Sequence, residues 1–472
     1  SLWKLLSDAG KRVGVMNVPI TYPPEEVNGF LIPGLDAPGI SDASVYPHGL
    51  MEEINRQVGR YILEAGIWGF IRQGKPDVAL EKLLEMVRTR TATAKYLMQN
   101  KEWDFFMVVY TAVDKVQHHF WKYIDPSRPE SRENYPYSDA IFQVYREVDR
   151  GLGELIAAAG DATLIIMSDH GAGPSSRRTM YINRWLHKEG LLHYEGAEGV
   201  RGRLQLLKYA FVRKVSNEVN KALSRKAKEK LLQLFPRLRG KMDSVLFLPG
   251  IDWSRTLAYS RENHPAVFIN TVGREATGIV MPGKDYEETR DEIIEKLKGL
   301  RCPDTGLPIV GKITKREEVY RGPAVFKAPD ILFQWNEHLY VHRPSGRNSG
   351  DSFLDVLDDK ALLEAENTNR PSGIHRDHGI LIAKGEAITE RQLIEPSRIY
   401  DITPTILYLL GVPIPTDMDG VVLRDAISAE FFRENAIQTD EMLRIDRTSP
   451  HGFDPAEADA ILQRLQGLGY ID

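Results

Sequence analysis

The residues that could do chemistry in this sequence are aspartates and histidines near the ends of apolar segments. The candidates are Asp114, His118, Asp169, His170 and His375, with His378 as an alternative to His375. Carboxylates mixed with imidazoles suit zinc or manganese better than calcium or magnesium alone. Because Cys302 is the single cysteine, a zinc site with two or more cysteine ligands is excluded. The sequence therefore predicts a metal site built from His and Asp.

Asp169 and His170 follow the segment Thr163–Met167, whose residues are all apolar or β-branched. This pattern is typical of a strand covered on both faces of a parallel sheet, and we expect it near the middle of the sheet. Ligands of open α/β sheets bind outside the carboxyl ends of the strands, where Asp169 and His170 would lie. The pair therefore indicates metal binding. The alternative is an Asp that caps the following turn beside a His that packs.

Asp114 and His118 follow a second apolar segment, Phe105–Tyr110. Residues four apart share one face of a helix, so the two side chains could converge on one ion if this region is helical. His119 would point elsewhere. The alternative is an Asp near a helix N-terminus with a surface His one turn later.

The elements that must position these residues are typical of an α/β protein. Val13–Val18 predicts a further buried strand, and the apolar periodicity of Pro76–Asn100 and Tyr145–Ala159 predicts helices. We expect a doubly wound, mostly parallel sheet with helices on both faces. The expected parts are the first part of the α/β core at 1–190, a helical cap at 191–245, the second part of the core at 246–435 and a C-terminal docking tail at 436–472.

The expected cap is strongly basic. Arg201 to Lys241 contains 13 Lys or Arg against two Glu, and its apolar residues recur at spacings of three and four. This pattern predicts a basic amphipathic helical insertion. It could be a solvated helical pair, a lid that brings positive charge over an anionic substrate, or a surface for anionic lipid.

The overall composition narrows the class of protein. A net charge of -5 argues neither for nor against a nucleic-acid partner, and we expect no sequence-specific nucleic-acid binding. No apolar run approaches the roughly 18 residues of a membrane-spanning helix, so no transmembrane segment is predicted. The chain is long enough to bury a substantial core.

Taken in order, these segments resemble the type I phosphodiesterase/nucleotide pyrophosphatase family of the alkaline phosphatase superfamily. The matching segments are Asn17 to Pro24, Asp114 to Trp121, Ser168 to Gly171, Ala328 to Asp330, Gly373 to His375 and Asp401 to Leu410. Their order is more specific than Ser-Asp-His-Gly alone. The resemblance covers nearly the whole chain and implies an alkaline phosphatase-like fold.

The resemblance also implies two divalent cations about 4 Å apart that stabilise an in-line phosphoryl transfer. The ions would be zinc, with manganese possible. By this likeness Asp114, His118 and His375 would hold one ion, and Asp169 with His170 would hold part of the other. His375 is preferred to His378 because family members commonly read Gly-x-His-Arg before the same apolar strand.

In the family, the second ion also takes an Asp from the first strand and a Thr or Ser nucleophile, both upstream of the segment that resembles Ser1 to Pro24. No catalytic residue is therefore assigned within this sequence, and Thr111, the nearest internal hydroxyl, is a poor replacement. We expect the natural protein to begin earlier, by roughly 100 residues, which would hold at least one more βα unit.

The expected function is metal-dependent hydrolysis of a phosphate ester, either a phosphodiester or a nucleotide pyrophosphate, through transfer to that upstream hydroxyl. The expected partner is a small-molecule phosphate ester or nucleotide. The alternatives are a non-catalytic metal- or ligand-binding member of the same fold, and a phosphonate hydrolase or phosphomutase. A sulfatase is disfavoured because Cys302 lies in Cys-Pro-Asp-Thr and not in Cys-x-Pro-Ser-Arg.

Overall fold

The computed structural model of the chain contains two compact units. The first unit comprises Ser1–Pro174 and Glu364–Asp472, and the second comprises Ser175–Leu363. The residues described are 1–131, 135–195, 248, 250–261, 264–336, 340–343, 352–368, 370–390, 392–394 and 396–441. The predicted basic insertion, from residue 196 on, and the predicted docking tail, from residue 442 on, lie outside the described residues.

The first unit contains a parallel sheet of three strands in the order β2-β1-β3. Its strands are β1 (Val13–Val18), β2 (Gly29–Pro33) and β3 (Phe105–Val108), and Val13 stands opposite both Gly29 and Phe105. The predicted strand at Val13–Val18 is confirmed with the same bounds. A parallel sheet places the carboxyl ends of its strands at one edge. The chain that leaves β3 at that edge leads directly to Asp114.

The described residues of the first unit also form three shorter strand pairs. They are β4 (Leu164–Met167) with β14 (Leu381–Lys384), β5 (Gly171–Pro174) with β13 (Gly373–Arg376), both antiparallel, and β15 (Ile414–Pro415) with β16 (Thr439–Asp440), which is parallel. The first two pairings bring residues after 370 beside residues near 170.

β4 differs from the central strand that Thr163–Met167 predicted. Among the described strands it pairs only with β14, and all four of its residues are partly exposed. An apolar run without alternation indicates that both faces are apolar, but it does not specify how many strands pair at its edges. The sequence therefore predicted the strand correctly and its place in the sheet wrongly.

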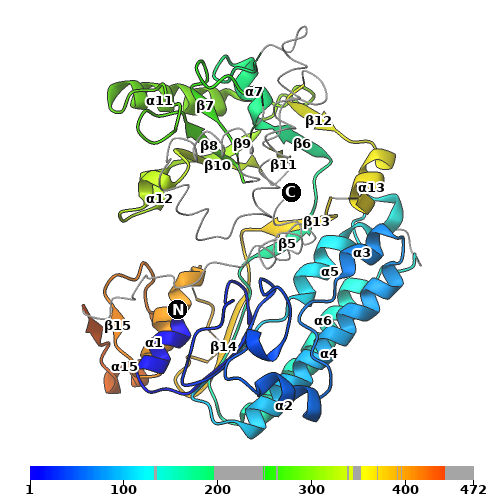
Figure 1. Ribbon diagram of the computed structural model, residues 1–472, viewed down its shortest axis with the longest axis vertical. Coiled ribbons are helices and arrows are strands. Elements are labelled where there is room, and N and C mark those ends of the chain that lie inside the picture. The colour runs from blue at the N-terminus through cyan, green and yellow to red at the C-terminus, as the bar shows by residue number, and fades with distance from the viewer. Residues whose placement is uncertain are drawn as a thin grey trace. The chain divides into compact units, whose positions relative to one another are not determined.

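Helices cover this unit, and α4 lies alongside α3, α5 and α6 (Figure 1). The helices among the described residues of this unit are α1 (Leu2–Asp8), α2 (Leu50–Gln57), α3 (Ile67–Arg72), α4 (Pro76–Asn100), α5 (Ala112–Phe120), α6 (Ala140–Ala159), α14 (Ile402–Leu409) and α15 (Ala429–Glu434). Leu83 of α4, Val116 of α5 and Val144 of α6 are fully buried in one shared cluster. This cluster holds α5 against the two longest helices.

The second unit is built on a four-stranded antiparallel sheet in the order β7-β8-β10-β9. Its strands are β7 (Ala258–Tyr259), β8 (Ala266–Ile269), β9 (Val310–Lys315) and β10 (Ile331–Trp335), and a second sheet has β6 (Arg178–Tyr181) between β11 (Tyr340–Arg343) and β12 (Leu354–Val356). The helices in the described part of this unit are α7 (Ile182–Lys188), α11 (Lys284–Gly299) and α12 (Arg316–Val319), and α13 (Asp359–Thr368) includes residues of both units.

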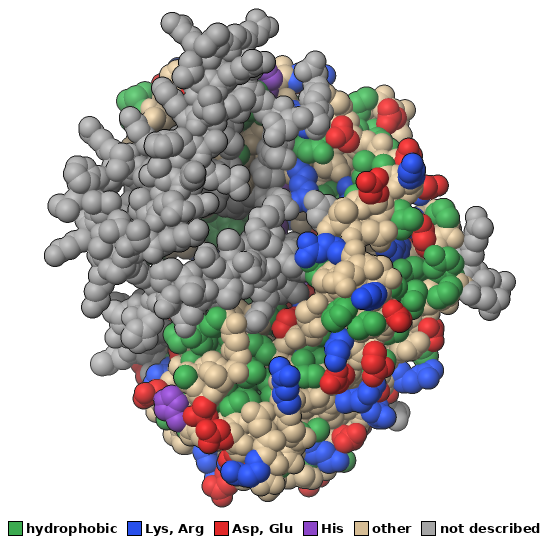
Figure 2. Space-filling view, turned by 45° about the vertical axis from the view of Figure 1, so that its right-hand side comes forward, with side chains coloured by type: hydrophobic (Ala, Val, Ile, Leu, Met, Phe, Trp, Pro, Cys, Tyr) green, Lys and Arg blue, Asp and Glu red, His purple; other side chains and the backbone are tan. Residues whose placement is uncertain are grey.

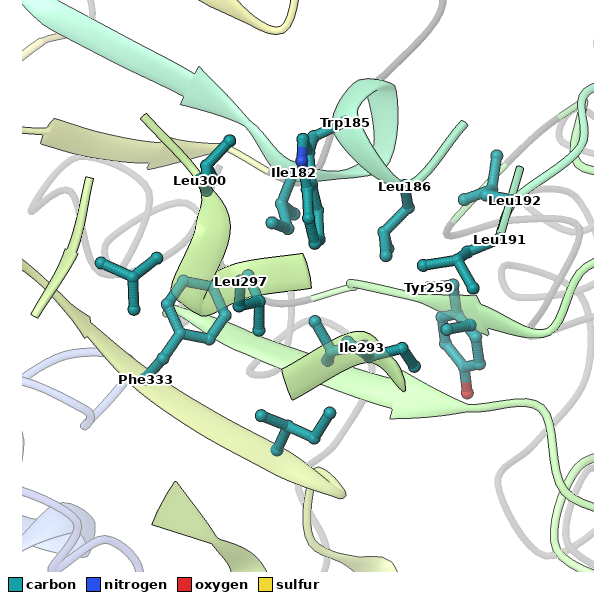
Figure 3. Close-up of a cluster of buried hydrophobic side chains, with 14 of the residues drawn as sticks. Ile182, Trp185, Leu186, Leu191, Leu192, Tyr259, Ile293, Leu297, Leu300 and Phe333 are labelled. Carbon is teal, nitrogen blue, oxygen red and sulfur yellow. The ribbon is translucent and has the colours of Figure 1, made fainter. Parts of the chain in front are cut away.

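The core of the second unit lies between α7, α11 and the four-stranded sheet. Trp185 of α7, Ile293 and Leu297 of α11, and Phe333 of β10 point into the same cluster (Figure 3). Ile293 and Leu297 stand one turn apart on α11, which is the spacing that puts two apolar side chains on one helix face.

On the face shown in Figure 2, Lys and Arg side chains are interspersed with Asp and Glu. This mixture agrees with the small net charge of -5. None of the helices in the described part of the chain combines the length and the apolar composition that a membrane span requires.

Candidate metal centre

Helix α5 carries two of the predicted ligands because its two faces differ. Ala112, Val116 and Phe120, each four residues from the next, are all 0% exposed. Asp114 and His118 have the same spacing but are displaced by two residues, which places them on the opposite side of the helix. The region is helical, which is the condition under which the sequence placed Asp114 and His118 on one face.

Asp114, His118 and His375 bring three potential ligand atoms together. His118 Nε2 lies 3.1 Å from Asp114 Oδ1, and His375 Nε2 lies 3.4 Å from the same oxygen. The two Nε2 atoms are 3.0 Å apart. All three ligand atoms lie within 4.8 Å of one another, and the three side chains are only partly exposed. One cation could contact all three.

The backbone determines which nitrogen of His118 faces this cluster. His118 Nδ1 lies 2.7 Å from the carbonyl oxygen of Gly373, which can only accept a hydrogen bond. Nδ1 therefore carries the proton, and in the neutral ring Nε2 presents its lone pair to Asp114 and His375. A carboxylate oxygen and two ring nitrogens this close together need a proton or a cation between them. This donor set of two imidazole nitrogens and one carboxylate oxygen fits zinc or manganese.

His170 and Asp169 lie beside these three residues. The His170 ring stacks on that of His375, with ring centroids 3.7 Å apart, and its Nε2 is 3.6 Å from Asp169 Oδ1 and 3.9 Å from Asp114 Oδ1. His170 Nδ1 lies 2.9 Å from the carbonyl oxygen of Gly171, so its Nε2 also presents a lone pair to the carboxylates. The five sequence-predicted residues therefore gather in one place.

The β5–β13 pair explains how residues near 170 meet residues near 375. His375 stands opposite Ala172 in this antiparallel ladder, two residues from His170. Close approach of the backbones requires glycine, because a Cβ on Gly373 would lie 2.3 Å from the carbonyl oxygen of Gln117. The motif Gly-x-His contains Gly373, but the sequence does not show that this glycine allows the backbone of β13 to approach α5.

Comparison with known families identifies the family of the chain. The profile of the family Type I phosphodiesterase / nucleotide pyrophosphatase matches residues 1–380. The chain belongs to this family. Neither the curated proteins nor the solved structures gave a match to the chain. The predicted resemblance is confirmed, and the mixed α/β architecture of the chain is consistent with the alkaline phosphatase-like fold of this family.

Membership in the type I phosphodiesterase family gives the cluster a chemical context. Members typically bind divalent metal ions and hydrolyse phosphate esters, and a possible metal-binding group, Asp114, His118 and His375, is present in this chain.

The electrostatics of the cluster favour positive charge at its centre. Burial alone would raise the pKa of the Asp114 carboxyl, but hydrogen bonds from His118 and His375 outweigh it and hold that pKa far below its usual range. Burial would likewise lower the pKa of His118, but the hydrogen bond to Asp114 raises it above the ordinary value. The pocket therefore keeps Asp114 ionised and stabilises a cation next to it.

Two neighbouring histidines lie elsewhere. His119 is buried against Trp68, with ring centroids 4.7 Å apart, and burial lowers its pKa to about 3. It faces away from the cluster, as its position on the helix predicted. His378 is exposed and does not belong to the three-residue group of ligands found among the described residues.

Proposed function

We propose that this chain forms the metal centre of a phosphoric ester hydrolase that acts on a phosphodiester or a nucleotide pyrophosphate. The observation that carries the proposal is the convergence of Asp114, His118 and His375 in a member of this family. Its substrate would be a small-molecule phosphate ester or nucleotide.

In this proposal, Asp114, His118 and His375 hold one divalent cation, and Asp169 with His170 contributes to a second. The donor atoms support zinc, with manganese as the other possibility. When bound, such ions stabilise the charge on the attacking and leaving oxygens of an in-line displacement.

The roles of the side chains follow from their contacts. Asp114 stays ionised at neutral pH because two imidazoles contact it. His118 is oriented by the Gly373 carbonyl and His170 by the Gly171 carbonyl, so each ring keeps Nε2 toward the carboxylates. Fixed rings reduce the reorganisation needed when substrate binds.

In this proposal the phosphoryl group would pass to the hydroxyl of a Thr or Ser nucleophile. A bond from phosphorus to that oxygen would form while the bond to the leaving-group oxygen breaks, and water would then release the phosphate. Thr111 does not fit this role, because its Oγ1 accepts a hydrogen bond from Arg90 at 3.2 Å.

The test measures the zinc and manganese content of the protein and its turnover of bis-p-nitrophenyl phosphate. We expect His118→Ala and Asp169→Asn each to lower metal content and turnover, and His119→Phe, which keeps a ring against Trp68, to leave metal content unchanged. Metal content and turnover that survive both site substitutions would refute the site. Metal binding without turnover of diester, pyrophosphate or phosphonate would identify a non-catalytic binding member.

A further inference from the structure

Arg90 of helix α4 is a buried arginine whose hydrogen bonds end beside the candidate metal centre. Its side chain is 1% exposed. Nη1 donates to the carbonyl oxygen of Val109 at 2.8 Å and to Thr111 Oγ1 at 3.2 Å. Nη2 donates to the carbonyl oxygen of Leu63 at 3.0 Å. One guanidinium therefore connects helix α4 to the segment from Val109 to Thr111 and to the segment around Leu63.

Two of these acceptors belong to the turn between β3 and α5. β3 ends at Val108 and α5 begins at Ala112, with Thr111 as its N-cap residue. The Thr111 side chain makes no hydrogen bond to its own helix and instead accepts from Arg90. The first turn of α5, which contains Asp114, is thus fixed from outside the helix.

A second contact connects α5 to the segment that contains Leu63. Glu64, the residue after Leu63, forms an ion pair of 2.8 Å with Lys115 of α5, and both side chains are buried or nearly so. Tyr61 of the same segment donates to Asn17 at the end of β1. Arg90 thus links the Tyr61–Glu64 segment to the start of α5, and Tyr61 connects that segment to β1.

The type of residue at position 90 is informative. Among the described residues Arg90 has no carboxylate within ion-pair distance, so its buried charge contacts neutral oxygens. A buried charge without a partner of opposite sign is costly, and an apolar side chain would fill the space at lower cost. What arginine adds is a planar set of donors with fixed directions.

We propose that Arg90 is a positioning residue of the metal centre, which fixes the β3–α5 turn and thereby the places of Asp114 and His118. This inference rests on the proposed function, since it assumes that these two side chains bind metal. Arg90 itself acts through α5 and touches neither ligand.

The test measures zinc affinity by competition with a chromophoric chelator, and the absorption spectrum of bound Co²⁺, which reports ligand geometry. We expect Arg90→Met to weaken zinc binding by about tenfold or more, the effect usual for residues that orient metal ligands. The Co²⁺ spectrum should change with it, and kcat should fall more than KM rises. Arg90→Lys should recover part of the affinity, because an ammonium can still donate to one of the carbonyls.

Leu83→Ala is the matched control, because Leu83 is fully buried on the same helix, in the cluster that includes Val116 of α5, and its apolar side chain makes no hydrogen bond to the turn. It should lower stability and leave zinc affinity and the Co²⁺ spectrum unchanged. Equal losses of affinity in Leu83→Ala and Arg90→Met would show general loosening of α4 and overturn the inference.

Thr111→Val provides a second test if Arg90→Met does not fold. It removes the hydroxyl that accepts a hydrogen bond from Arg90 and keeps the shape of the side chain. Weaker zinc binding in Thr111→Val and Arg90→Lys would support the inference, and unchanged binding in both would overturn it. A wild-type protein that binds no zinc would instead refute the proposed function, so the two failures are distinguishable.

Discussion

The Nε2 atoms of His118 and His375 lie 3.0 Å apart although 257 positions separate the two residues. Backbone contacts enforce this pair. The amide nitrogen of Ser372 donates to the carbonyl oxygen of His118 at 2.7 Å, and His118 Nδ1 donates to the carbonyl oxygen of Gly373 at 2.7 Å. The last turn of α5 and the first residue of β13 are therefore joined, and the candidate metal centre can form only when both parts of the first unit have folded.

This geometry predicts which of the two histidines His375 and His378 binds metal. His375→Gln should weaken zinc binding by more than about 100-fold, because loss of a ligand should exceed the effect of losing a residue that orients one. His378→Gln should leave the affinity unchanged, since His378 is exposed and outside the cluster. Calorimetric zinc titration of both variants measures the difference. A larger loss in His378→Gln would reverse the assignment.

Asp114, His118, Asp169 and His170 were predicted from local spacing, whereas His375 was chosen over His378 from the family resemblance. Asp114 and His118 are four apart on a helix, and the Ser-Asp-His-Gly segment follows an apolar strand. The contacts that orient their rings could not be predicted, because the Gly373 carbonyl reaches His118 across 255 positions. Periodicity identifies which face of an element is polar, but it does not identify the element that faces it.

For the fold as well, local elements could be predicted and contacts between distant segments could not. The strand at Val13–Val18 and the helix at Pro76–Asn100 were predicted from apolar pattern with the bounds that the structure has. The edge position of β4 was missed, because the pairing partners of a strand depend on residues far away in the sequence. Arg90 was missed for a related reason, since a single arginine within a helical pattern reads as an exposed residue.

Asp330 should be a main determinant of stability in the second unit. Its side chain is 0% exposed, and its carboxylate accepts from both terminal nitrogens of Arg274 at 2.8 and 2.6 Å, from Arg316 at 2.8 Å and from the Tyr286 hydroxyl at 2.7 Å. Asp330→Ala leaves two partly buried guanidinium groups without this partner and should lower the free energy of unfolding by about 3–5 kcal/mol.

Urea unfolding measures this loss. Asp291→Asn is the control, because Asp291 is exposed and pairs with Lys315 at the surface, at 2.7 Å. It should change the free energy of unfolding far less than Asp330→Ala. Similar losses in the two variants would show that the buried cluster around Asp330 contributes little to stability.

Ile20 should gain stability when replaced by glycine. It has φ of 60°, which is unfavourable for a β-branched residue, and it is 89% exposed, so little burial is lost. Asp36 holds this conformation by accepting from the amide nitrogens of Ile20 at 2.7 Å and Tyr22 at 3.0 Å. Relief of about 1–2 kcal/mol of left-handed strain should exceed the entropic cost of glycine, about 0.5–1 kcal/mol.

Thermal unfolding should therefore give a higher midpoint for Ile20→Gly than for the wild type. Val421→Gly serves as the comparison, because Val421 is also largely exposed, at 65%, but is not among the residues with positive φ. It should lower the midpoint. A lower midpoint for Ile20→Gly would mean that the side chain of Ile20 makes contacts that outweigh the backbone strain.

The contact of Glu53 with Lys101 should make stability depend on pH. Lys101 Nζ, at the C-cap of α4, donates to Glu53 Oε2 of α2 at 2.7 Å, and the Tyr96 hydroxyl donates to Oε1 at 2.9 Å. The hydrogen bond from Lys101 holds the pKa of Glu53 below its ordinary value of 4.5. The unfolded chain therefore binds the Glu53 proton more tightly than the folded chain does, and the stabilisation is complete above pH 4.5 and disappears as the pH falls below it.

Glu53→Gln should accordingly lower the free energy of unfolding at pH 7 by up to about 1 kcal/mol, the usual range for a partly exposed ion pair. The difference from wild type should shrink toward zero by about pH 3, where Glu53 is protonated in the unfolded chain and increasingly in the folded one. Urea titrations at pH 7, 5 and 3 measure it, with the exposed neighbour Glu52→Gln as the control. A difference that stayed constant across this range would mean that Glu53 contributes through packing or neutral hydrogen bonds, because only a charge-dependent contact is lost on protonation.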